Sequence, residues 1–188
     1  MRNMRQYGHT GVYFALLVDM DDKDYLILRE LQRNARTTNL ELARLAGLSP
    51  TGLQKRLEKL EAAGVIGAYV AVLDREKLGY DLMCFVHVNL RYHSVDLVRK
   101  FRAAVKAMPE VLECHHITGE ADYVLKIAVR DRQHLEAFLV NTLTPAPGVE
   151  RIRTSLVLSE IKSTTALQIG ANPDPERRPR RARKENNV

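Results

Sequence analysis

The residues best suited to a binding role lie in a short stretch between positions 49 and 59. Polar and basic side chains recur there at Ser49, Thr51, Gln54, Lys55, Arg56 and Lys59. Hydroxyl and amide groups can bond base edges, whereas Lys and Arg neutralise phosphates or bond guanine. The free amides at the start of a helix would add a phosphate-binding end. These residues predict contact with double-stranded DNA, although a charged outer face is equally typical of a solvated helix.

Two short helices joined by a tight turn are expected to position those side chains. Asn39 can cap the first helix, and Gly47 can end it in the left-handed conformation. Ser49 can cap the second helix, Pro50 suits its first position, and Gly64 can end it. Within the second helix, leucines spaced i, i+4, i+7 predict one buried stripe opposite the polar residues.

A third helix is predicted before this pair, over residues 21–33. Its first turn is acidic, which the helix dipole favours, and Ile27, Leu28 and Leu31 follow helical spacing. Three such helices can share one core, as in helix-turn-helix DNA-binding domains. The apolar run at residues 65–72 then predicts a short strand that begins a wing or hinge.

The second half of the chain alternates between strand and helix patterns. Strands are expected at residues 82–90, 111–118, 123–129 and 149–161, and helices at 95–108 and 131–143. This βαββαβ order is the ferredoxin-like arrangement, so the predicted fold class is α+β. Helices cover one face of such a sheet, and we expect the open face to be apolar and buried by a second copy of the chain.

Positive charge is concentrated at the C-terminus. The formal net charge is +6, and residues 172–188 hold 6 Lys and Arg against 3 Asp and Glu, whereas residues 20–69 hold 8 against 7. The tail is rich in Pro and Arg, so it cannot bury enough apolar surface to fold alone. It is interpreted either as a loose contact with phosphate or as a solubilising tail.

Candidate catalytic and metal-binding residues are few. Glu113, Cys114, His115 and His116 are adjacent on a predicted strand, where alternation places Cys114 and His116 on one face. A metal site there would need ligands from elsewhere, with His87 as a strand candidate, so a hydrogen-bonded histidine is favoured. We expect no catalytic residue, no metal and no cofactor.

Two further features concern the compartment. Cys84 and Cys114 form no CxxC pair and are expected to be buried free thiols in a reducing compartment. The apolar run at residues 11–18 is too short to span a bilayer and lacks a small-residue cleavage site. We therefore expect a cytoplasmic protein with no membrane partner, in which Met20 is an alternative start.

From about residue 20 to residue 169, the chain resembles the Lrp/AsnC family of bacterial and archaeal transcription regulators. The matching stretches are MDDKDYLILRELQRNAR, SPTGLQKRLEKLEAAGVIGAY, KLGYDL, ECHHITGEADYVLK and PGVERIRTSLVLSEIK, in this order. The resemblance implies a winged helix-turn-helix whose recognition helix spans residues 49–63. It also implies a C-terminal domain that oligomerises, as dimers and often octamers, and binds a small amino acid between dimers.

The resemblance also implies where that effector binds. The Gly-x-x-Asp turn of the family corresponds to Gly119 and Asp122, where turn amides would meet a carboxylate and Asp122 an ammonium. The alternative is that these residues only form a hairpin turn. The implied effector site comprises His116, Gly119, Glu120, Asp122, Thr154, Ser155 and Leu156.

These expectations divide the chain into five segments. They are an N-terminal extension (1–19), a winged helix-turn-helix DNA-binding domain (20–69), a hinge strand or linker (70–80), a ferredoxin-like domain for effector binding and oligomerisation (81–163), and a C-terminal edge segment with a disordered basic tail (164–188).

The predicted function is a homo-oligomeric, sequence-specific transcription regulator that binds double-stranded DNA and responds to a small effector, an amino acid. One alternative is an architectural DNA-binding protein without an effector. Another is a metal-responsive regulator that uses Cys114 and His116. The third is a haem-pathway decarboxylase on the same scaffold, for which His87, His93, His115 and His116 would serve; we expect no enzyme.

Overall fold

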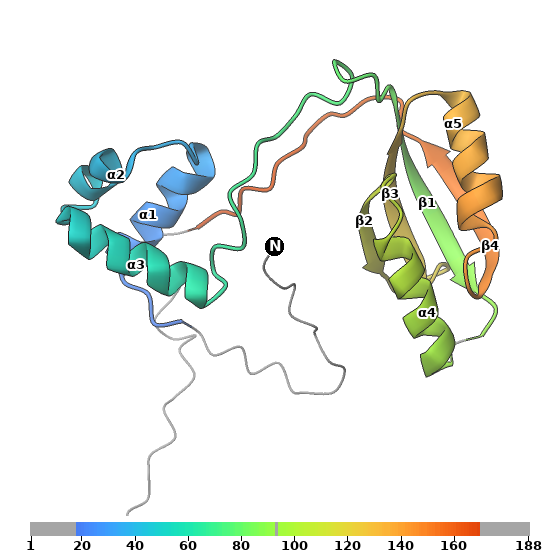
Figure 1. Ribbon diagram of the computed structural model, residues 1–188, viewed down its shortest axis with the longest axis horizontal. Coiled ribbons are helices and arrows are strands. Elements are labelled where there is room, and N and C mark those ends of the chain that lie inside the picture. The colour runs from blue at the N-terminus through green and yellow to red at the C-terminus, as the bar shows by residue number, and fades with distance from the viewer. Residues whose placement is uncertain (1–17, 93, 170–188) are drawn as a thin grey trace, which may run out of the picture. The chain divides into compact units, whose positions relative to one another are not determined.

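A computed structural model describes residues 18–92 and 94–169 (Figure 1). They form two compact units, one of residues 18–71 with 164–169 and one of residues 72–163. Most of the predicted N-terminal extension, the basic tail and His93 lie outside the described residues. Within the described part of the chain, no helix is both long enough and apolar enough to cross a membrane.

The first unit contains the three predicted helices. They are α1 (Asp22–Arg33), α2 (Asn39–Leu45) and α3 (Pro50–Ala62). Gly47 and Gly64 follow α2 and α3 with φ of 60° and 71°, which confirms the predicted left-handed ends. The α2 cap is Thr38, whose side chain accepts from the Glu41 amide, so the prediction of Asn39 was wrong by one residue.

A single core holds the three helices together. The predicted leucine stripe of α3 is buried, with Leu53 and Leu60 fully inaccessible to solvent, and Ile27 and Leu42 meet it from α1 and α2. Burying each such side chain contributes about 1.5–3 kcal/mol, so this core fixes the polar residues of α3 on the opposite side of the helix.

The second unit has the predicted βαββαβ order. Its elements are β1 (Leu82–Leu90), α4 (Val95–Lys106), β2 (Val111–His116), β3 (Tyr123–Val129), α5 (Arg132–Ala137) with its π-helical continuation η1 (Phe138–Leu143), and β4 (Val149–Leu156). The sheet order is β2-β3-β1-β4, with every neighbouring pair antiparallel. The ferredoxin-like prediction is confirmed, but β4 ends at Leu156 rather than at residue 161.

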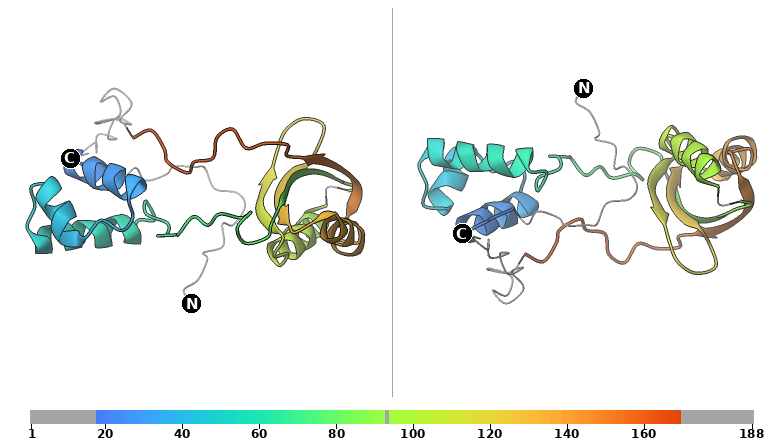
Figure 2. Two further views of the ribbon diagram at one scale, coloured as in Figure 1. Left: turned by 90° about the horizontal axis from the view of Figure 1, so that it is seen from above. Right: turned by 90° about the horizontal axis from the view of Figure 1, so that it is seen from below.

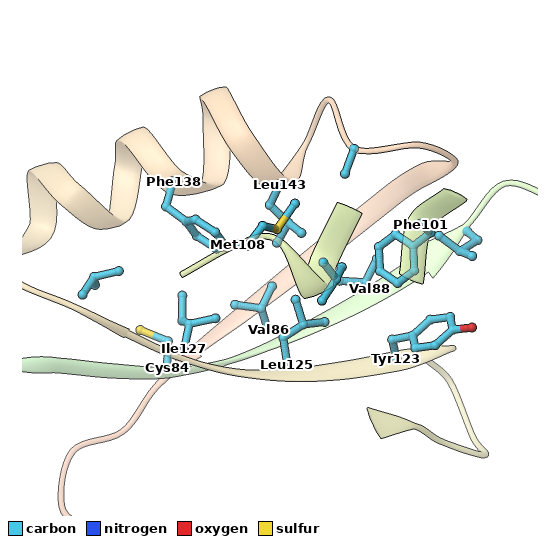
Figure 3. Packing of buried hydrophobic residues seen from close by; sticks show 14 residues of the cluster. Cys84, Val86, Val88, Phe101, Met108, Tyr123, Leu125, Ile127, Phe138 and Leu143 are labelled. Atoms are coloured by element: carbon cyan, nitrogen blue, oxygen red, sulfur yellow. The ribbon is translucent and has the colours of Figure 1, made fainter. Parts of the chain in front are cut away.

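Both helices cover the same face of this sheet (Figure 2). The core between these helices and the sheet contains Val86, Val88, Phe101 and Leu125, all fully buried (Figure 3). The opposite face was predicted to be apolar, and that prediction was wrong in part. Apart from Met83 and Phe85, the residues that β1 and β4 direct to that face are polar, namely His87, Asn89, Arg151, Arg153 and Ser155.

The hinge strand predicted at residues 65–72 is also absent from the described chain. Residues 67–74 have no regular secondary structure, nor do residues 164–168 of the predicted C-terminal edge segment. Val70 and Val72 are 72% and 90% exposed. A β-prone sequence forms a strand only when another strand is available to pair with it.

Candidate DNA-binding face and effector turn

The outer face of α3 presents a row of exposed polar side chains at Thr51, Gln54 and Lys55. Ser49 lies at the start of this row, but its hydroxyl accepts from the Gly52 amide at 3.1 Å and caps the helix. The Gln54 amide donates to Glu58 at 3.0 Å, one helical turn away. These contacts are local and solvent-exposed, so a duplex could replace them at low cost.

Arg56 has a different environment from Lys55. Its guanidinium donates to Asp21 at 2.8 Å and to Asp24 at 2.7 Å. The side chain of Asp24 is only 4% exposed. Arg56 therefore neutralises a buried carboxylate of α1, and the contact lowers the pKa of Asp21 while raising that of Arg56.

The sequence contained a signal for this ion pair that we missed. Arg56 follows Leu53 by three residues and precedes Leu60 by four, which places it at the margin of the buried stripe. The acidic first turn of α1, interpreted only as favourable to the helix dipole, supplies its partners.

The predicted basic residues of α3 gather around one hollow. A hollow of about 420 Å³ is lined by Lys55, Arg56 and Lys59 together with Asp19, Met20, Asp21, Asp24 and Gly52. The Lys59 ammonium donates to the carbonyl oxygen of Asp19 at 2.7 Å. Arg56 thus meets two carboxylates and Lys59 meets a backbone carbonyl, whereas Lys55 is an exposed basic residue beside them.

In the second unit, the turn between β2 and β3 is held by its own polar groups. Gly119 has φ of 115°, a conformation that suits glycine. The Asp122 carboxylate accepts from the Leu90 amide at 2.8 Å, and the Asn89 side chain donates to the Glu120 carbonyl at 2.7 Å. Asp122 therefore secures the end of β1, where the pairing of β1 with β4 shifts register.

The implied effector residues do not converge within one copy of the chain. Thr154 and Leu156 pair with the inward-facing Val86 and Cys84, whereas Ser155 pairs with Phe85 on the open face. His116 stacks on Tyr123, with ring centroids 4.9 Å apart, on the side of the helices. Strand alternation separates these side chains onto two faces of the sheet.

A smaller hollow lies beside the turn on the open face. Its volume is about 220 Å³, and it is lined by His87, Asn89, Ile117, Glu120, Ala121, Arg151 and Arg153. Arg153 donates to Glu120 at 3.0 Å. The His87 Nδ1 atom is buried without a hydrogen-bond partner among the described residues. The two arginines were not predicted, although their alternation in the β4 sequence places them on one face.

The adjacent cysteine and histidine of β2 lie as alternation predicts. Cys114 and His116 face the helices and line a hollow of about 430 Å³ with Arg102 and Tyr123. Cys84 is buried as predicted, but Cys114 is exposed, so that prediction was wrong. Partial desolvation still raises the pKa of the Cys114 thiol, with Arg102 opposing. Within the described residues, no group of three or more His, Cys, Asp or Glu is arranged to hold a metal.

Two families of known domains match the chain. Residues 20–66 match a family of winged helix-turn-helix DNA-binding domains, and residues 83–167 match the Lrp/AsnC ligand binding domain. The leucine-responsive regulatory protein of Haemophilus influenzae is 40% identical over 148 residues, which are 79% of this chain and 89% of that protein. Its Escherichia coli counterpart is 38% identical over 151 residues, 80% of this chain and 92% of that protein.

Solved structures give the same result. A transcriptional regulator from Neisseria meningitidis, crystallised as a complex with L-Met, is 40% identical and superposes with a TM-score of 0.75, covering 79% of this chain and 96% of that one. Escherichia coli AsnC is 30% identical with a TM-score of 0.72, covering 79% and 98%. The chain therefore belongs to the Lrp/AsnC family and is a DNA-binding transcriptional regulator with an effector-binding domain.

Proposed function

We propose that α3 enters the major groove of a specific operator and that Thr51, Gln54 and Lys55 make the contacts. The observation that carries this proposal is the continuous exposed polar row on a helix whose opposite face is buried. Gln54 suits a base edge, Lys55 suits guanine or phosphate, and the helix start at Ser49 suits phosphate. In a dimer, two such helices would meet successive major grooves about 34 Å apart.

Arg56 and Lys59 have different roles in this proposal. Arg56 stabilises α3 against α1 through its two carboxylates, so we assign it no base contact. Lys59 bonds an exposed backbone carbonyl, which a phosphate oxygen can replace, so it remains a candidate phosphate contact. This assignment divides the predicted basic residues of α3 into contacting and stabilising groups.

We propose that the effector is a small amino acid bound at the turn of residues 117–122. The complex of the Neisseria relative with L-Met supports this class of ligand. The turn places an exposed carboxylate, Glu120, beside the guanidinium of Arg153, so both charges of a zwitterion have complementary groups nearby. Asp122 would orient the turn through its bond to the Leu90 amide.

A homo-oligomer would complete that site. The candidate residues His116, Thr154, Ser155 and Leu156 lie on two faces of one sheet, so a single ligand can meet them only if a second copy contributes. The segments of residues 67–74 and 157–168, which contain no helix or strand, expose apolar side chains. Val72 is 90%, Leu158 92% and Ile161 91% exposed, and this exposure supports association. We propose a dimer that can assemble further, to an octamer, in the cytoplasm and without enzyme activity.

A gel shift on the upstream region of the protein's own gene tests this function, with and without each of the common amino acids. We expect a specific complex whose affinity or mobility one or a few amino acids change, and size-exclusion chromatography should show the same ligand altering the oligomer. Specific binding that no amino acid affects, in either assay, would instead support the architectural alternative. Absence of specific binding would contradict the assignment of α3.

A further inference from the structure

Two arginines of β4 are joined by hydrogen bonds to the turn between β2 and β3. The Arg151 guanidinium donates to the side-chain oxygen of Asn89 at 3.5 Å, and the Asn89 side-chain nitrogen donates to the Glu120 carbonyl at 2.7 Å. The Arg153 guanidinium donates to the Glu120 carboxylate at 3.0 Å. These groups line the hollow of about 220 Å³ on the open face of the sheet, which we call the arginine hollow.

The charges that line the arginine hollow do not cancel. The lining contains two Arg and one Glu. An amino acid with an uncharged side chain would pair its ammonium with Glu120 and its carboxylate with Arg153. The charge of Arg151 would then face no carboxylate, so a second carboxylate on the ligand is what the hollow lacks.

The remaining wall of the hollow is also suited to a polar ligand side chain. Asn89 and His87 line it, beside the smaller apolar contribution of Ile117 and Ala121. The His87 Nδ1 atom is buried without a hydrogen-bond partner among the described residues. An apolar ligand side chain would cover the Arg151 guanidinium and replace its water without offering an acceptor, which costs free energy. A carboxylate offers two acceptor oxygens and avoids that cost.

The size of the arginine hollow limits the ligand. Its volume of about 220 Å³ equals the space of about seven water molecules, at about 30 Å³ each. Pockets for drug-sized ligands have volumes of about 300–1,000 Å³. The hollow therefore suits one small amino acid rather than a nucleotide or a larger cofactor.

We propose that the effector is an amino acid with an acidic side chain, aspartate or glutamate, and that its side-chain carboxylate binds Arg151 in the arginine hollow. Its ammonium would meet Glu120 and its other carboxylate Arg153. The inference rests on the proposed function, because it takes the turn of residues 117–122 as the effector site, and it adds the class of amino acid. Arg151 is thus the residue that determines specificity.

Isothermal titration calorimetry of the full chain tests the ligand class. The ligands are L-aspartate and L-glutamate, together with L-asparagine and L-glutamine, which have nearly the same shapes without the side-chain charge. We expect one acidic amino acid to bind at least about tenfold more tightly than its amide, because hydrogen bonds between charged groups are stronger than neutral ones. Succinate, which has two carboxylates and no ammonium, should bind much more weakly than L-aspartate.

The Arg151→Gln variant tests the residue that the inference names. We expect the ratio of affinities for the acidic amino acid and its amide to fall to about one, since the variant keeps a hydrogen-bond donor but loses the charge. Arg99→Gln is the matched control, because it removes the same charge from an exposed position on α4. Its ratio should equal that of the parent. An acidic preference that survives Arg151→Gln would overturn the role of Arg151.

The outcomes distinguish this inference from the function on which it rests. If an uncharged amino acid such as L-Met binds as tightly as the acidic ones, the acidic class is wrong and the proposed amino-acid effector stands. If succinate binds as tightly as L-aspartate, the ligand class is dicarboxylates in general and the inference is wrong. If no amino acid binds, the inference and the proposed effector both fail.

Discussion

The two units differ in where their polar side chains find partners. In the helical unit, the Asp24 carboxylate is buried but meets the Arg56 guanidinium. In the sheet unit, His87 Nδ1 is buried without a partner among the described residues, and Arg151 and Arg153 lie on an exposed sheet face. The helical unit is thus complete in one copy of the chain, whereas the sheet unit has surfaces suited to another molecule.

This difference matters for how each site can be assembled. A DNA-binding helix needs a rigid support behind it, and the internal ion pairs of α1 and α3 provide that support. A ligand can shift an oligomer equilibrium only if the two states bind it differently, and contacts from a second copy would supply such a difference. The separation of the candidate effector residues onto two sheet faces fits that requirement.

The largest expected effect comes from breaking the internal pairing of the helical unit. Arg56→Ala would leave the Asp24 carboxylate buried and without its cation, which costs about 3–5 kcal/mol. Hydrogen exchange measured peptide by peptide should show α1 and α3 losing protection while the sheet unit keeps it. Lys55→Ala, one residue earlier and exposed, is the matched control, and we expect it to change stability by less than about 0.5 kcal/mol. Similar losses in both variants would remove the distinction between the two cations.

The second prediction concerns packing in the sheet unit. A Cβ added to Gly148, which has φ of 80°, would lie 2.6 Å from Leu97 Cδ2. Overpacking costs about 1–3 kcal/mol and the left-handed backbone about 1–2 kcal/mol, so we expect Gly148→Ala to reduce protection in α4 and β4. At Gly119, with φ of 115°, no atom lies within 4 Å of the added Cβ. Gly119→Ala should therefore destabilise the sheet unit less than Gly148→Ala does. A larger loss of protection in Gly119→Ala would mean that the turn is more tightly packed than the loop before β4.

Sequence patterns predicted the parts of this molecule that depend on local chemistry. The leucine stripe of α3, the left-handed glycines after α2 and α3 and the βαββαβ order follow from spacing and turn residues within a few positions of each other. The α2 cap was misplaced by one residue because Thr38 and Asn39 are both good capping residues.

Two features that the sequence did not reveal depend on a distant partner. The segment at residues 65–72 has the composition of a strand, but the described chain offers it no strand to pair with. The error at the open sheet face has a local cause, because alternation along β1 directs His87 and Asn89 outward. The pairing of Arg56 with Asp21 and Asp24 spans more than thirty positions. Which of several carboxylates meets a given arginine is decided by tertiary packing.

The third prediction tests the DNA-contacting row and has a moderate effect. Lys55→Gln removes one candidate phosphate or guanine contact without altering the core. We expect operator affinity to fall about tenfold and the salt slope by about 0.9 if Lys55 contacts phosphate. Anisotropy titrations at several salt concentrations measure both quantities, and the hydrogen-exchange profile should remain that of the parent. Unchanged affinity together with an unchanged slope would exclude Lys55 from the interface.

The smallest expected effect separates the charge of Asp21 from its capping role. Asp21→Asn keeps a side chain that can cap α1, since Asn and Asp are similar caps, but removes the negative charge near Arg56. The Arg56 guanidinium lowers the pKa of Asp21 below its ordinary value of 3.8. A lowered folded-state pKa contributes stability above the unfolded pKa and loses it as pH falls through the folded pKa. The parent should thus be slightly more stable than the variant at neutral pH, and the two should converge as the pH falls through the lowered pKa of Asp21. Hydrogen exchange of α1, compared at matched intrinsic exchange rates, measures this difference in stability. A stability difference that persists in acid would mean that Asp21 stabilises the helical unit through its shape and hydrogen bonds and not through its charge.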